Sequence, residues 1–228
     1  MKHLLCLILL LGGICSHAQQ PTDLTVREVY DFGIGDVYQY RWTTYNYQGF
    51  NGVTVNAYTT YTLIARNTQT NQLVYTWHRL EESKYTTGMS GGTNYKNDTV
   101  VTSYTKLDSS VLLTSLQAHD TLVLPPCNYC HVDSIYTSAA HNGRTIVHHY
   151  QGDAMASGYT TWGQGLGLVI GHLMSEDGGM EQGADELVYY RKANGETWGD
   201  LYVINYVGIS DNKLDNKPII YSNSGMVM

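Results

Sequence analysis

The sequence has 228 residues, of which only 14% are charged, and its formal net charge is −7. Nucleic acid and anionic lipid require basic surfaces, so this mildly acidic composition excludes them as expected partners. Tyrosine contributes 20 residues and phenylalanine only 2. Tyrosine and threonine at this density favour β-strands.

Residues 1–18 are typical of a secretory signal peptide. Lys2 precedes an apolar run at residues 4–11 that is too short to span a bilayer. Small residues follow at Ser16 and Ala18, so we expect cleavage after Ala18. No later apolar segment of about 18 residues occurs, and we expect no transmembrane helix. The sequence therefore predicts a protein exported through the periplasm and secreted or held at the outer cell surface.

Residues 19–207 carry the pattern of one β-rich domain. In the strand expected at 37–42, Tyr38, Tyr40 and Trp42 share one face, which we expect to be buried, and Gln39 lies on the opposite, wet face. Residues 81–98 are polar and rich in glycine, which predicts an exposed loop. Further strands are expected at 24–30, 53–66, 73–77, 99–107, 111–116, 121–124, 134–138, 145–150 and 201–207. Short strands between turns predict an all-β fold, with an antiparallel sheet that forms a sandwich or a curled, barrel-like single domain.

Residues 159–191 are expected to form the closing hairpin of this domain. Alternating Gly163, Gly165 and Gly167 lead into a strand at 168–170, and an acidic loop returns the chain to a strand at 187–190. The glycines do not fit G-x-G-x-x-G and no helix follows, so the segment does not indicate nucleotide binding. We expect them to allow a bend or close packing of the strand.

Residues 208–228 form a polar linker and a short tail. This tail resembles the start of the type A C-terminal sorting domain of the type IX secretion system of Bacteroidetes, which implies export. The family's two turn prolines are replaced by Ser222 and Ser224. The matching residues are Gly208, Ile209, Leu214, Asn216, Ile219, Ile220 and Tyr221.

The main domain resembles secreted Bacteroidetes β domains of uncharacterised function. This resemblance implies an architecture and no activity. It rests on the pattern Asp31-Phe32-x-Ile34-Gly35-Asp36-Val37-Tyr38-x-Tyr40, on Gly165-Leu166-Gly167-Leu168-Val169, and on Leu187-Val188-Tyr189-Tyr190 followed by Trp198-Gly199.

Cys127, Cys130 and His131 form a C-x-x-C-H pattern, the signature of c-type haem attachment. The pattern follows Pro125-Pro126 and precedes an expected strand, so it lies in a loop and lacks the helical setting usual for such sites. A disulfide between Cys127 and Cys130 across a tight turn is the favoured interpretation in an oxidising compartment. Haem c attachment, and free or metal-bound thiols, are the alternatives.

The acidic loop of the closing hairpin contains Glu176, Asp177, Glu181 and Asp185. Carboxylates on a flexible loop can bind Ca²⁺, but no recognised ligand spacing occurs here. A solvated hairpin loop is the favoured interpretation, with a Ca²⁺ site as the alternative.

Ser90 lies in a G-x-S-x-G pattern formed by residues 88–92. A nucleophile elbow needs a strand before the serine and a helix after it, and the flanking residues indicate neither. With no converging acid, base and nucleophile, the sequence predicts a non-catalytic module that binds glycan or protein through exposed tyrosine and tryptophan. A c-type haem or thiol redox protein is the alternative function, and a hydrolase using Ser90 is a third.

Overall fold

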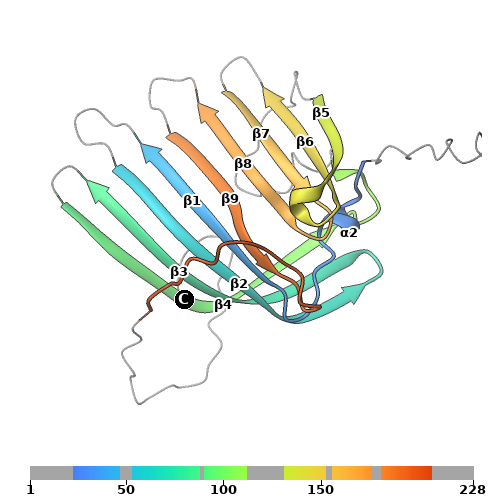
Figure 1. Cartoon of the computed structure of the whole chain (residues 1–228), viewed down its shortest axis with the longest axis horizontal. Helices are drawn as coiled ribbons and strands as arrows, with labels where there is room; N and C mark the ends of the chain where they lie inside the picture. Colours follow the sequence, from blue (N-terminus) through green and yellow to red (C-terminus); the bar gives the residue numbers. More distant parts are fainter. Residues whose placement is uncertain are drawn as a thin grey trace, which may run out of the picture.

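The computed structural model describes residues 23–46, 53–87, 90–111, 131–152, 156–175 and 181–206. They form one antiparallel sheet of 10 strands that curls without closing (Figure 1). The strands are β1 (Val37–Asn46), β2 (Val53–Gln69), β3 (Gln72–Thr87), β4 (Ser90–Thr105), β5 (His131–Ser138), β6 (Arg144–Gly152), β7 (Ala156–Gly163), β8 (Gly167–Ser175), β9 (Glu181–Arg191) and β10 (Thr197–Gly199). A short 3₁₀ turn, η1 (Ala139–His141), follows β5. The predicted all-β antiparallel fold is confirmed, in its curled form.

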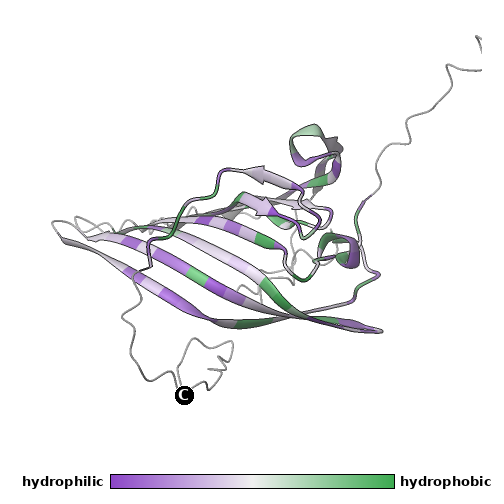
Figure 2. Cartoon of the chain, turned by 60° about the horizontal axis from the view of Figure 1, so that its bottom comes forward, coloured by the Kyte–Doolittle hydropathy of each residue, from purple (hydrophilic) through white to green (hydrophobic). Residues whose placement is uncertain are grey.

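Two meanders make up the sheet, whose strand order is β4-β3-β2-β1-β9-β8-β7-β6-β5. The first meander is β1 to β4 and the second is β5 to β9. The two meanders are joined where β1 pairs with β9. The short strand β10 also pairs with β9. The closing hairpin predicted in residues 159–191 is the β8 and β9 pair, with Ile170 opposite Glu186. Figure 2 shows the two meanders as two walls of the curled sheet, with the short helix α2 between them at one end.

Residues expected to begin the sheet instead form the helix α2 (Val26–Val29). The prediction of a strand at 24–30 is wrong because Thr25 and Glu28 form a capping box, in which each side chain bonds the other residue's backbone N–H. Val26 and Val29 are buried in the aromatic core. No helix formed by the described residues is both long and apolar enough to cross a membrane.

The polar segment at 81–98 is part of a long hairpin, so the prediction of an exposed loop there is wrong. Strands β3 and β4 pair from Gln72 and Thr105 up to Thr87 and Ser90. Polar side chains pair across the strands in place of apolar ones, as in the ion pair between Arg79 and Asp98. The apolar alternation that identifies a half-buried strand is therefore absent here.

The predicted strand at 201–207 is also wrong, because residues 201–206 form no strand. This segment instead crosses the convex face of the sheet, where the amide of Gln39 bonds both backbone groups of Tyr202 at 2.8 Å. Gln39 is consequently fully buried, although we expected it on a wet face. Of the strands predicted at 111–116 and 121–124, only the buried Val111 lies within the described residues, and it belongs to no strand.

Candidate functional site

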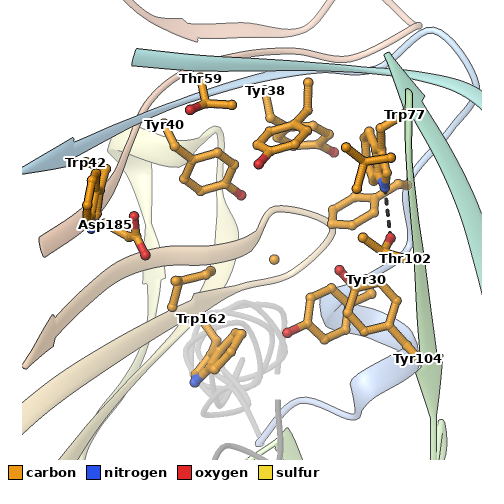
Figure 3. A pocket seen from close by; sticks show the side chains of 15 residues that line it. Tyr30, Tyr38, Tyr40, Trp42, Thr59, Trp77, Thr102, Tyr104, Trp162 and Asp185 are labelled. Carbon is orange, nitrogen blue, oxygen red and sulfur yellow. Dashed lines mark hydrogen bonds between the residues drawn. The ribbon is translucent and has the colours of Figure 1, made fainter. Parts of the chain in front are cut away.

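A cavity of about 320 Å³ opens on the concave face of the sheet (Figure 3). Both meanders contribute to it, and most of the side chains around it are aromatic. Its lining residues are Tyr30, Phe32, Tyr38, Tyr40, Trp42, Thr59, Tyr61, Trp77, Val100, Thr102, Tyr104, Trp162, Gly167, Leu168 and Asp185.

The period-two alternation of β1 places three of these rings in the cavity. Tyr38, Tyr40 and Trp42 share the concave face, as predicted from the sequence. Their partners on β2 and β9 extend the surface, since Tyr38 lies opposite Tyr61 and Trp42 opposite Asp185. A local sequence pattern therefore builds one wall of the site.

One end of the cavity is closed by tightly packed rings. Tyr30 stacks on Tyr104 with ring centroids 3.8 Å apart and meets Trp162 edge-on at 6.0 Å. Phe32 lies behind them, 5.2 Å from Trp77. Tyr30, Phe32, Trp77 and Trp162 are all buried, so this end of the cavity excludes water.

The other end is open to solvent at Trp42, which is 37% exposed. Figure 3 shows Trp42 beside Asp185, with Tyr40 next to them and Tyr30 and Tyr104 at the opposite end. The site thus runs from a polar mouth to an aromatic base.

The polar edges of several rings are bonded to the protein itself. The Tyr38 hydroxyl lies 2.9 Å from the carbonyl oxygen of Gly165, and the Tyr40 hydroxyl donates to Leu166 at 3.4 Å. The Trp77 indole N–H donates to the Thr102 hydroxyl at 2.9 Å. Because their edges are satisfied in this way, Tyr38, Tyr40 and Trp77 are held in fixed orientations and offer mainly their faces to a ligand.

The phenol groups around the cavity are neutral at physiological pH. Burial raises the pKa of Tyr104 to about 12 and raises the pKa of Tyr30, Tyr38, Tyr40 and Tyr61 as well. As neutral phenols they can exchange hydrogen bonds with a ligand.

Among the lining residues that the structure describes, Asp185 is the one carboxyl group, and none is a histidine, cysteine, serine, lysine or arginine. Its negative charge also contributes to the raised pKa of Tyr40 and Tyr61.

Other sequence-predicted residues lie away from the cavity or outside the described residues. Cys127 and Cys130 lie outside, and of His131, the first residue of β5, only the backbone is described. The disulfide, haem and thiol interpretations therefore stay predictions.

The acidic loop is only partly described. Glu176 and Asp177 lie outside the described residues, and Glu181 begins β9 with only its backbone described. Asp185 lies further along β9 and faces the cavity. Among the side chains that the structure does describe, no three His, Cys, Asp or Glu groups are placed to hold a metal ion. The Ca²⁺ loop stays a prediction.

Ser90 begins β4, and its hydroxyl donates to the carbonyl oxygen of Thr87 at 3.2 Å. A strand follows this serine, so the helix that a nucleophile elbow requires is not there. Gly91 and Gly92 continue β4 after the serine, so the described residues give the hydrolase hypothesis no support.

The chain matches no family model and no curated protein. It is similar to a solved structure from Parabacteroides distasonis described as a "putative lipoprotein", at 10% sequence identity and a TM-score of 0.30. The match covers 73% of this chain and 98% of the other. A likeness this distant carries no argument about function, so the case for the site rests on its own geometry.

Proposed function

We propose that this protein is a non-catalytic binding module that holds a small, largely apolar molecule in the cavity of its curled sheet. The observation that supports this proposal is the cavity of about 320 Å³ with its aromatic lining. Small-molecule sites are typically concave, largely preformed, apolar and of about 300–1,000 Å³, with few polar groups to orient the ligand. The size and chemistry of this cavity fit the lower end of that range.

A cavity ligand fits the distribution of aromatic residues better than a flat protein-binding surface does. Phe32, Trp77 and Trp162 are buried around the cavity. The exposed tyrosines lie in several places: Tyr95 contacts Tyr206 at 5.9 Å, whereas Tyr136 lies on β5 at the opposite edge of the sheet. These surface aromatics therefore do not all belong to one contiguous patch of the kind that marks a protein interface.

Export to the cell surface or the medium is part of the proposal. It is supported by the signal-peptide pattern of residues 1–18, which lie outside the described residues. Mass spectrometry of the exported protein tests it, because cleavage after Ala18 predicts a mature chain that begins at Gln19.

The binding function is tested by filling the cavity. Val100 lines the cavity on β4, and the adjacent Val101 points to the other face and is 58% exposed. A panel of small aromatic alcohols, amines, acids and monosaccharides, screened by ligand-observed NMR, is expected to yield ligands for the wild-type protein.

Val100→Trp is expected to abolish binding of these ligands, and Val101→Trp, the matched control, to leave it intact. The proposal is overturned if no compound binds at millimolar concentration, or if both variants bind as well as the wild type. Turnover of any compound by the wild type would contradict the non-catalytic assignment.

A further inference from the structure

We propose that Lys192 and Asp36 condense to an isopeptide bond, an amide that joins the Lys192 Nζ to the Asp36 Cγ and releases one water molecule. The ion pair of these two residues is the form before condensation. The proposal is independent of the binding function. It rests on a buried amine, a buried carboxyl group and a hydroxyl group that contacts both.

The surroundings of the pair favour the uncharged, reactive forms of both groups. The Lys192 side chain is 11% exposed and that of Asp36 is 2% exposed. The Lys192 Nζ lies 5.8 Å from the centre of the Phe32 ring and 5.3 Å from that of Tyr38. Burial lowers the pKa of Lys192, which favours the neutral amine that can attack a carbonyl carbon. Proton transfer from the ammonium group to the carboxylate therefore produces an amine and a carboxylic acid in contact.

Tyr38 provides a path for the proton. Its hydroxyl oxygen lies 2.6 Å from the Lys192 Nζ and 3.0 Å from the Asp36 Oδ2. A hydroxyl group can accept a proton from one partner while it donates its own to another. A proton lost by the amine can thus reach Oδ2, the oxygen that leaves as water.

Backbone N–H groups hold the carboxyl group in place. The N–H of Ala193 donates to Oδ1 of Asp36 at 2.9 Å, and the N–H of Gly33 donates to Oδ2 at 2.8 Å. Negative charge develops on Oδ1 when Nζ attacks Cγ, and the Ala193 N–H is placed to stabilise it. Oδ1 then becomes the carbonyl oxygen of the amide and keeps this hydrogen bond.

The condensation balances without a further reactant. One bond forms between Nζ and Cγ, and the Cγ–Oδ2 bond breaks with its electron pair on Oδ2. Two of the three ammonium protons end on Oδ2 as water, the third stays on the amide nitrogen, and nothing is oxidised or reduced. Groups held together in this way react as if each were present at about 10⁵–10⁸ M, which favours the amide over its hydrolysis.

Two exposed ion pairs of the same chemistry provide internal controls. Lys84 pairs with Glu82 at 2.7 Å, and Lys96 pairs with Glu81 at 2.8 Å. The lysine side chains are 57% and 52% exposed, so water keeps their ammonium groups charged. These pairs should stay unlinked, which separates the effect of burial from that of contact.

The bond would fasten the place where the two meanders join. Asp36 directly precedes β1 and Lys192 directly follows β9, and the adjacent residues Val37 and Arg191 pair across these strands. A force applied between the chain before Asp36 and the chain after Lys192 would pass through the amide. The strands between them would carry none of it.

Peptide mapping of the folded, full-length wild-type protein tests the proposal. After reduction, alkylation, unfolding and trypsin digestion, tandem mass spectrometry should find residues 28–41 joined to residues 192–213. The joined peptide should be lighter than its two parts by one water molecule and uncut after Lys192, whereas trypsin should cut after Lys84 and Lys96. The proposal is overturned if trypsin cuts after Lys192 and the peptide with Asp36 keeps its full mass.

A time course tests the part of Tyr38. Chains recovered unfolded in urea should lack the bond and form it after dilution into buffer, and a bond formed in urea would contradict the role of burial. Tyr38→Phe is expected to slow bond formation at least about tenfold. Tyr40→Phe is the matched control, because the Tyr40 hydroxyl donates to Leu166 instead, and it should react as the wild type does. Equal rates in the two variants would overturn the proton path.

Discussion

Lys192 and Asp36 form a buried ion pair next to the aromatic cluster, with side chains only 11% and 2% exposed. The ammonium group also donates to the Tyr38 hydroxyl at 2.6 Å and to the carbonyl oxygen of Gly165 at 3.0 Å. Asp36 accepts from the backbone N–H of Ala193 at 2.9 Å. The pair therefore connects the start of β1 to the β7–β8 turn and to the end of β9.

Asp36→Asn should destabilise the protein strongly. Burial lowers the pKa of Lys192, while its hydrogen bond to Asp36 raises it and keeps the ammonium form acceptable. Removing the carboxylate leaves an ammonium group buried without its counter-charge, which typically costs about 3–5 kcal/mol. Urea denaturation measures the loss of unfolding free energy.

The matched control is Asp108→Asn, which breaks the exposed pair with Arg27, whose side chains are 86% and 41% exposed. Exposed pairs contribute about 0–1 kcal/mol, so this variant should unfold nearly as the wild type does. Similar losses in the two variants would show that the buried pair does not have the structural role assigned to it.

The segment that contains Asp36 could be predicted from the sequence because neighbouring residues determine its structure. The pattern from Asp31 to Tyr40 combines a turn with a strand of period two, and both are determined by neighbouring residues. The burial of Gln39 could not be predicted, because its partner Tyr202 is 163 residues away. The hairpin at 81–98 was missed for a different reason, since its strands extend beyond the core and carry polar residues on both faces.

Stability is expected to fall at acid pH through Glu196. Its pKa is lowered from 4.5 to about 2, first because the Arg144 guanidinium donates hydrogen bonds to it, and further by bonds from Tyr190 and Asn142. A carboxyl group whose pKa is lower in the folded state stabilises the fold above its unfolded pKa, and this contribution is lost as the pH falls from about 4.5 toward 2.

The comparison of wild type with Glu196→Gln isolates this group from the other carboxylates. The wild type should be more stable at neutral pH by at most about 2 kcal/mol, because the Glu196 side chain is 21% exposed and solvent screens the pair. Urea melts at several pH values should show this difference shrinking as the pH falls toward 2. A difference that stays constant with pH would assign the effect to packing.

The candidate site was less predictable than the sheet. Period two identified Tyr38, Tyr40 and Trp42 as one face, but no local pattern indicates that Tyr104 and Trp162 meet Tyr30. Tyr104 belongs to the first meander, Trp162 to the second and Tyr30 to the end of α2, so their convergence depends on how strongly the sheet curls. Sequence analysis identified motif residues as the candidate site residues, whereas most residues that line the cavity are ordinary strand residues.

Gln39 is expected to hold residues 200–206 against the convex face. Gln39→Ala removes both bonds to the Tyr202 backbone and should raise amide exchange at Tyr202 at least about tenfold, with a loss of about 2 kcal/mol in unfolding free energy. Tyr202→Phe is the control. It removes the hydroxyl bond to Glu82 at 2.7 Å but keeps the backbone bonds and the ring stack on Tyr58 at 4.0 Å. Fast exchange in the control alone would mean that the hydroxyl holds the segment.

Gly167 tests how tightly the aromatic cluster is packed. Its φ of +73° is strained for any side chain, and a Cβ there would lie 3.0 Å from the Phe32 ring. Gly143 has nearly the same φ, +76°, but a Cβ there would meet nothing within 4 Å. The two glycines therefore separate backbone strain from crowding.

Gly143→Ala should cost about 1–2 kcal/mol for the left-handed backbone alone. Gly167→Ala should cost about 1–3 kcal/mol more, because Phe32 is held between Tyr38 at 5.0 Å and Tyr75 at 5.4 Å and cannot move aside freely. Thermal and urea unfolding of both variants measure the difference. Since Gly167 and Phe32 both line the cavity, Gly167→Ala should also weaken binding of the small aromatic alcohols of the ligand panel, and Gly143→Ala should not. Equal costs in the two variants would mean that the Phe32 ring moves aside for the added methyl group. The base of the cavity would then be less rigid than its packing indicates and would adapt to ligands of several shapes.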